Sequence, residues 1–90
     1  MKVGELIVEP GREEHIARHR VRVEEAEQVV FGDHVAYRVR LGRYGLVGQT
    51  HSGRYLFVLL APRGEGTYAL VTARDASVNE RRLYRRQRKY

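Results

Sequence analysis

The sequence contains no cysteine in its 90 residues. This absence excludes a disulfide scaffold, a zinc site with thiolate ligands and a cysteine nucleophile. Apolar runs are also short, and none approaches the ~18 residues that a membrane-spanning helix requires. The first residues lack the apolar segment of a secretory signal. We therefore expect a cytoplasmic protein without membrane attachment.

The chain is short for a protein of several domains, because domains usually comprise ~100–200 residues. Its hydrophobic content of 42% and its charged content of 31% are typical of globular proteins. We expect residues 1–90 to form a single domain around one modest core.

Acidic residues are scarce in the second part of the chain. Residues 1–33 hold 5 Lys and Arg against 8 Asp and Glu, whereas residues 34–90 hold 12 against 3. Arginine supplies 15 of the 17 basic residues, and its planar guanidinium binds phosphate through paired hydrogen bonds and stacks on bases. This bias favours a polyanionic partner. The alternative is a basic surface that only keeps the domain soluble.

Helical spacing of apolar residues dominates the first third of the chain. We expect helices over residues 13–19 and 23–31, preceded by a short edge strand within residues 3–8. From residue 34 the period becomes alternating, which is typical of strands with one exposed face. Glycine-containing turns then separate four expected strands, over residues 35–41, 46–50, 55–61 and 67–73. The third of these is apolar almost throughout, so we expect it at the centre of the sheet.

A last helix is predicted at the C-terminus. Ser77 and Glu80 have the spacing of a capping box, which opens a helix running toward Arg88. On a helical wheel one arc of about 160° is wholly cationic. It comprises Arg81, Arg82, Arg85, Arg86, Arg88 and Lys89. Such a face can bind phosphates, or it can be a solvated face whose arginine stems cover a small core.

The expected architecture is α+β: two N-terminal helices, an antiparallel meander of about four strands with a further short edge strand, and a C-terminal helix. Alternate connections of a meander lie at the same end of the sheet. We therefore expect one group near the start of the last helix, consisting of His34, His51, Arg54 and Arg74. The opposite end should carry Arg40, Arg43 and Arg63.

Two histidines, His15 and His19, are spaced to lie on one helical face. A zinc site is one interpretation, but the metalloprotease motif needs Glu where Ile16 stands, and no third ligand is evident. A surface pair near a helix C-terminus is the alternative. We expect no metal and no cofactor.

The residue types suit one reaction in particular. No phosphate-binding glycine loop, paired carboxylates or Gly-x-Ser-x-Gly motif is present. Arginine, histidine and tyrosine are the groups that a metal-independent ribonuclease can use. One group deprotonates the 2′-hydroxyl, another protonates the leaving 5′-oxygen, and cations stabilise the charge on phosphorus.

Several sequence blocks together resemble the BrnT toxins of type II toxin–antitoxin systems. The blocks are His-Ile-Ala-Arg-His-Arg-Val (15–21), Glu-Glu-Ala (24–26), Gly-Arg-Tyr-Gly (42–45), Gly-Arg-Tyr-Leu (53–56), Val-Thr-Ala-Arg-Asp-Ala (71–76) and Glu-Arg-Arg with Tyr84 (80–84). The resemblance implies a fold similar to that of the RelE family of RNA-cleaving toxins. It also implies an endoribonuclease acting on RNA, neutralised by a BrnA-like antitoxin through which it could form an oligomer.

The same resemblance implies site residues. By position it indicates Arg54, Arg74 and Tyr84 as active groups and Arg43 as a phosphate contact, and His19 matches a histidine common in BrnT sequences. His51 has no such match and is a candidate only because the expected meander places it near Arg54 and Arg74. Accordingly Arg54 and Arg74 would stabilise charge, and proton transfer would fall to His19, His51 or Tyr84.

The expected contacts to nucleic acid are Arg18, Arg43, Arg81 and Arg85. BrnT sequences usually have glycine after the matched histidine, where this chain has Arg20. A residue other than glycine in a left-handed conformation there costs ~1–2 kcal/mol. The alternative to the ribonuclease is a non-catalytic basic domain that docks RNA, DNA or a partner chain through its C-terminal helix.

Overall fold

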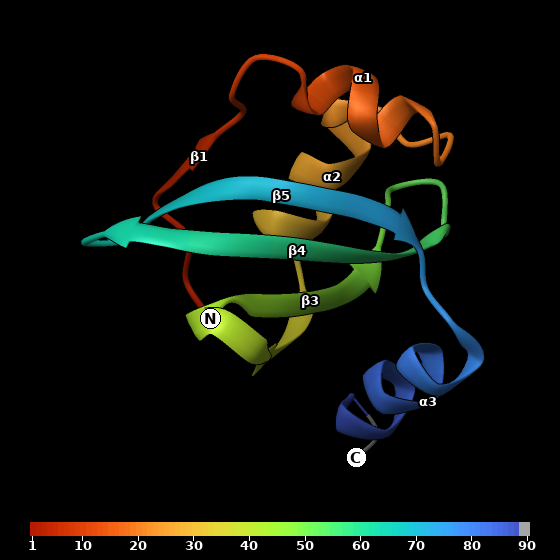
Figure 1. The fold of residues 1–90 in the computed structure, drawn as a ribbon. Helices are drawn as coiled ribbons and strands as arrows, with labels where there is room; N and C mark the ends of the chain where they lie inside the picture. Colours follow the sequence, from red (N-terminus) through yellow and green to blue (C-terminus); the bar gives the residue numbers. More distant parts are fainter. Residues whose placement is uncertain (89–90) are drawn as a thin grey trace.

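A computed structural model describes residues 1–88, so the expected place of Lys89 on the last helix lies outside the described residues. The elements in chain order are β1 (Glu5–Ile7), α1 (Arg12–Ala17), α2 (Val23–Val30), β2 (His34–Arg38), the short 3-10 helix η1 (Arg40–Gly42), β3 (Tyr44–Gln49), β4 (Tyr55–Gly64), β5 (Thr67–Asp75) and α3 (Val78–Gln87). Figure 1 shows α1 and α2 on one side of the sheet and α3 beyond the end of β5 on the other. The expected α+β architecture is confirmed.

The sheet has five strands in the order β1-β5-β4-β3-β2. Strands β2 to β5 form the expected antiparallel meander, with β4 at the centre. The expected edge strand is also present. It pairs parallel to β5, with Leu6 opposite Tyr68, so the sheet is mixed.

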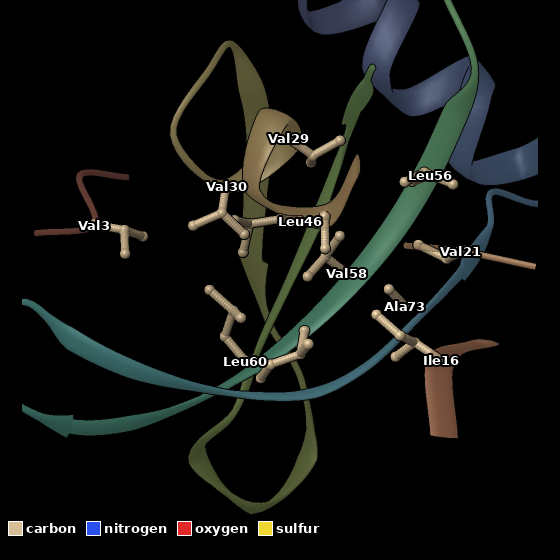
Figure 2. Close-up of a cluster of buried hydrophobic side chains, with 12 residues drawn as sticks. Val3, Ile16, Val21, Val29, Val30, Leu46, Leu56, Val58, Leu60 and Ala73 are labelled. Atoms are coloured by element: carbon tan, nitrogen blue, oxygen red, sulfur yellow. The ribbon is translucent and has the colours of Figure 1, made fainter. Parts of the chain in front are cut away.

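The main core lies between the sheet and the helices α1 and α2. Because side chains alternate along a strand, Leu56 and Val58 of β4 point to this side. They belong to one buried cluster with Val29 of α2 and Ile16 of α1 (Figure 2). All four side chains are fully buried, so this cluster holds both helices against the sheet.

A smaller cluster on the other side of the sheet holds α3. It is formed by Val47, Phe57 and Tyr84. Gly45 is required here, because a Cβ at that position would lie 2.7 Å from the Phe57 ring. The predicted capping box is confirmed: the Glu80 N–H donates to Ser77 Oγ (3.1 Å), and the Ser77 N–H donates to Glu80 Oε1 (2.8 Å).

Several element boundaries differ from the sequence prediction, and two of them differ because of backbone turns. The strand expected over residues 35–41 ends at Arg38, since Leu41 adopts φ 63° and its side chain is 83% exposed. The loop expected over residues 62–66 is a two-residue turn. Glu65 and Gly66 both have positive φ there, which suits a tight hairpin and lets β4 continue to Gly64.

No helix formed by residues 1–88 combines the length and the apolar composition needed to cross a membrane.

Candidate nucleic-acid interface

A hollow of about 470 Å³ lies where β4 begins and β5 ends. Its lining comes from the turn before β4, from the end of β5 and from the first half of α3, which the meander brings together. The lining residues are Gly53, Arg54, Tyr55, Asp75, Ala76 and Arg81. Two arginines and one aromatic ring thus border one concave surface, which is the combination that nucleic-acid sites use.

Arg54 is held by four groups from three parts of the chain. Its Nε donates to Asp75 Oδ1 (2.9 Å), and its Nη1 donates to Glu25 Oε1 (3.2 Å). The same Nη1 donates to the backbone carbonyl of Arg20 (2.6 Å), and Nη2 donates to that of His19 (3.4 Å). The guanidinium is therefore fixed beneath the link between α1 and α2.

The Arg20 carbonyl that binds Arg54 belongs to a strained residue. Arg20 has φ 59°, so a side chain other than glycine occupies the left-handed region. This is the position where BrnT sequences usually carry glycine. Strained residues persist where the surrounding structure holds them, often at functional sites. Here the left-handed conformation of Arg20 turns the chain from α1 toward α2 and directs the Arg20 carbonyl to Arg54.

Arg20→Gly is expected to raise the free energy of unfolding by about 1 kcal/mol, since left-handed strain of ~1–2 kcal/mol exceeds the added chain entropy of glycine. Urea unfolding measures this. Arg18→Gly is the matched control, because Arg18 has helical φ of −62° and is also exposed. It should lower stability by about 1 kcal/mol. Equal effects of the two variants would contradict the argument from strain.

Glu25 is the least exposed partner of Arg54, with a side chain 13% exposed. It accepts the Arg22 backbone N–H (3.0 Å) at the start of α2. This hydrogen bond, together with the charge of Arg54, outweighs burial and lowers the pKa of Glu25 below its usual 4.5. Glu25 therefore stays ionised and links the start of α2 to Arg54.

Arg74 lies on the opposite side of the sheet from Arg54. Its partner across the strands is Phe57, and its guanidinium carbon lies 4.3 Å from the centre of that ring. Both Nη atoms donate to Glu80, each at 2.9 Å. Arg54 lines the hollow and Arg74 does not, because Arg54 binds Glu25 of α2 whereas Arg74 packs on Phe57 and binds Glu80 of α3.

The ion pair between Arg74 and Glu80 holds the start of α3 against β5. Burial tends to raise the pKa of Glu80, but hydrogen bonds from Arg74 and from the Ser77 N–H outweigh it, so this pKa lies below 4.5. Phe57 and Glu80 together hold Arg74 in place. Arg74 thus connects β5 to the helix that carries Arg81.

Stability should fall in acid because the folded state lowers the pKa of both Glu25 and Glu80. A lowered carboxyl pKa contributes stability above the unfolded value of 4.5, and this contribution disappears as the pH falls through the folded pKa. Urea unfolding at about pH 7 and about pH 3 measures the loss. The double variant Glu25→Gln, Glu80→Gln should be less stable at pH 7 and lose less in acid. The same acid loss in both proteins would contradict this.

The two histidines expected near these arginines, His34 and His51, both contact the end of α2. His51 donates its backbone N–H to Gln28 Oε1 (2.9 Å) and lines another hollow, against α2. The Nδ1 atom of His34 lies 2.9 Å from the Val29 carbonyl. Within residues 1–88 no hydrogen bond joins either ring to Arg54 or Arg74. The order of strands fixes the end of the sheet at which a residue lies but not its side, and Arg74 lies on the side of α3.

His19 is the one histidine of residues 1–88 whose residue forms a hydrogen bond with Arg54. Its carbonyl accepts from Arg54, and its residue is exposed. The His15 and His19 rings meet edge to face at 5.7 Å, and His15 Nε2 lies 3.1 Å from Thr72 Oγ1. Among the described residues no group of three or more His, Cys, Asp or Glu could hold a metal ion.

Tyr84 is buried, with 6% of its surface exposed, in the packing of α3 on the sheet. Its ring meets that of Tyr55 edge to face at 5.9 Å, and the Arg88 guanidinium carbon lies 5.3 Å from its centre. It does not line the hollow. Its position is that of an anchor for α3.

The expected nucleic-acid contacts fall into three places. Arg81 and Arg85 lie with their guanidinium carbons 5.9 and 5.8 Å from the centre of the Tyr55 ring. Arg18 ends α1 and lines a different hollow. Arg43 precedes β3, at the opposite end of the sheet as expected. Only Arg81 of the four lines the hollow beside Arg54.

The cationic arc of the last helix is therefore only partly solvated. Arg81 and Arg85 lie near the Tyr55 ring, while Arg88 contacts Tyr84 and also pairs with Asp33 at 2.9 Å. Tyr55 was not selected from the sequence, although it belongs to the Gly-Arg-Tyr-Leu block. A single tyrosine at the start of a strand gave no signal of its own.

Comparison with known structures supports the fold. The crystal structure of the Brucella abortus ribonuclease toxin BrnT matches this chain with a TM-score of 0.66. The match covers 81% of this chain and 96% of that chain, at 20% sequence identity. No protein-family model and no curated protein sequence matches the chain. At this identity the similarity establishes a BrnT-like fold, and the resemblance stated from the sequence blocks is confirmed at that level.

Proposed function

We propose that this protein is a ribonuclease toxin that cleaves RNA without a metal ion and is neutralised by a BrnA-like antitoxin. The fold shared with a ribonuclease toxin carries the proposal. The hollow lined by Arg54 and Arg81 supports it, because this hollow offers cations to a phosphate chain.

The reaction follows from the groups available. A base removes the proton of the 2′-hydroxyl, and the 2′-oxygen bonds to phosphorus. The bond from phosphorus to the 5′-oxygen then breaks, and an acid protonates that oxygen, which leaves a 2′,3′-cyclic phosphate. Arg54 stabilises the charge that develops on the phosphate oxygens. Arginine remains protonated, so another residue must transfer the protons.

His19 is our first candidate for proton transfer. It is exposed, and its backbone carbonyl is bound to Arg54, so its ring starts from a point fixed relative to that guanidinium. His51 is the second candidate, and it lines a separate hollow against α2. Arg74 acts as a positioning residue, since it holds the helix that carries Arg81.

Cleavage of single-stranded RNA by the purified protein in EDTA tests the proposal. We expect products that end in a 2′,3′-cyclic phosphate. Changing His19 to Ala should slow cleavage by about 100-fold or more, and changing His51 to Ala should slow it less. Cleavage that requires a divalent metal would reject the mechanism. RNA that is bound but never cut would favour the second function below.

The second function is that of a non-catalytic basic domain. Arg82 and Arg86 favour it, because both are exposed and form no ion pair within residues 1–88. Binding through them should weaken with salt, with a slope of roughly −0.7 per phosphate on single strands.

A partner encoded beside this chain would separate the two functions. A neighbouring gene for a protein with a DNA-binding part favours the toxin. Co-purification would then give the stoichiometry of the complex, including any oligomer that forms through the antitoxin.

A further inference from the structure

The two arginines of the hollow differ in how much of their charge is free. Arg54 lies between two carboxylates, Glu25 and Asp75, at 3.2 and 2.9 Å. These carboxylates offset much of its charge, and one N–H of Nη2 forms no hydrogen bond within residues 1–88, so this donor is left to bind a phosphate oxygen. Arg81 forms no ion pair with any residue of the described chain, and its Nε is buried without a hydrogen-bond partner. Of the two arginines that line the hollow, Arg81 is thus the one with no carboxylate partner within residues 1–88, and an added anion can neutralise it.

Tyr55 provides an aromatic surface directly beside that cation. The residue is half-buried and lines the hollow. The edge-to-face contact with Tyr84 fixes the ring from one side, and Arg81 and Arg85 lie within 6 Å of its centre. A ring held in this way loses little side-chain freedom when a flat ligand stacks on it.

A nucleotide combines the two features that this pair of residues recognises. Its base has a π face that stacks on an aromatic ring, and its phosphate supplies the negative charge that can pair with Arg81. We propose that Tyr55 and Arg81 form a nucleotide subsite in which one unpaired base of single-stranded RNA stacks on Tyr55 and its phosphate binds Arg81. The identity of the ligand as RNA rests on the proposed function, whereas the binding itself requires no cleavage.

The subsite selects for unpaired bases. A base within a duplex is stacked between its neighbours and presents no free face to Tyr55. Every base has a π face, so the contact should tolerate different sequences. The hollow would therefore favour single strands over duplexes without reading a particular base.

The test measures binding with an RNA that cannot be cut. The probe is a single-stranded oligonucleotide with 2′-O-methyl groups throughout, which lack the attacking hydroxyl, and with 2-aminopurine at one position. Fluorescence anisotropy gives the affinity, and 2-aminopurine fluorescence reports stacking. Tyr55→Leu should weaken binding about 5- to 150-fold and reduce the quenching. Tyr55→Phe keeps the ring and should bind within about twofold of the unchanged protein.

Arg81→Gln separates the phosphate contact from the stacking contact. Its binding should show a salt slope smaller by about 0.7, with the quenching retained. The salt slope of Tyr55→Leu should stay unchanged. Tyr68→Leu is the matched control. The rings of Tyr44 and Tyr68 form a similar edge-to-face pair, with their centres 6.0 Å apart, and neither residue lines the hollow. Thermal unfolding checks that each variant is folded.

Three outcomes of the binding experiment would overturn the subsite. The first is that Tyr55→Leu binds the single-stranded probe as tightly as the unchanged protein. The second is that Tyr55→Leu loses as much affinity for duplex RNA as for the single strand. The third is that Tyr68→Leu loses as much affinity for the probe as Tyr55→Leu. If the unchanged protein stacks on the probe but cuts no RNA, the ribonuclease proposal fails and the subsite stands. If it cuts RNA and Tyr55→Leu leaves KM unchanged, the subsite fails and the ribonuclease proposal stands.

Discussion

Arg54→Ala is expected to slow RNA cleavage about 100- to 1,000-fold, because it removes the donor that stabilises charge on the phosphate. It should also lower the free energy of unfolding by about 2–3 kcal/mol. Glu25, only 13% exposed, would lose the closer of its two arginine ion pairs, and the carbonyl of Arg20 would lose a hydrogen bond of 2.6 Å. Single-turnover cleavage and urea unfolding measure the two effects separately.

Asp75→Asn is the matched control for Arg54→Ala. It removes a charge from the same network, but the Asp75 side chain is 71% exposed. Its stability should change by less than about 1 kcal/mol, as for exposed ion pairs. Arg54→Lys keeps the charge but cannot serve the same four groups, so we expect partial recovery of cleavage. Full activity in Arg54→Ala would remove this residue from the mechanism.

Arg74→Ala is expected to abolish most cleavage through a different route. The variant loses the contact with Phe57 and both hydrogen bonds to Glu80, so the start of α3 is no longer held to β5. Arg81 then loses its fixed position beside the hollow. Stability should fall by only about 1–2 kcal/mol, since the Arg74 side chain is 40% exposed and water screens the pair.

Hydrogen exchange distinguishes this positioning role from direct catalysis. Amide protection along α3 (Val78–Gln87) should decrease in Arg74→Ala but not in Arg54→Ala. Glu80→Gln should give the same pattern as Arg74→Ala in a milder form, because the carboxylate is 16% exposed and part of the capping box. A fully active Arg74→Ala protein, or one with unchanged protection of α3, would contradict the proposed route.

The order of elements could be predicted because it depends on local patterns. The change from helical to alternating spacing at residue 34 predicted the start of the meander, and Ser77 with Glu80 predicted the start of α3. The apolar run from Tyr55 predicted the central strand. Boundaries failed at Leu41 and at the turn of Glu65, where a positive φ ended or redirected the backbone. Such angles in residues other than glycine leave no mark in the spacing of apolar residues.

The composition of the candidate site depended on contacts between distant segments. The sequence identified Arg54 and Arg81 as cations and placed one end of the sheet near the start of α3. The side of the sheet on which Arg74 lies depends on which residue it pairs with in the neighbouring strand. Arg74 pairs with Phe57, so it lies on the same side of the sheet as that ring. Counting within the sequence could not supply that register.

By itself, then, the amino-acid sequence determined the element types, the meander order and the excess of positive charge, because these follow from side-chain periodicity and composition. Tertiary structure alone decided which positive charges remain free. Glu25, Asp75 and Glu80 neutralise Arg54 and Arg74 through ion pairs, four of whose carboxylate contacts lie at 2.9 to 3.2 Å. Arg81 is left beside Tyr55 with no carboxylate among residues 1–88 to pair with, and charge balance of this kind exists only once the segments have folded together.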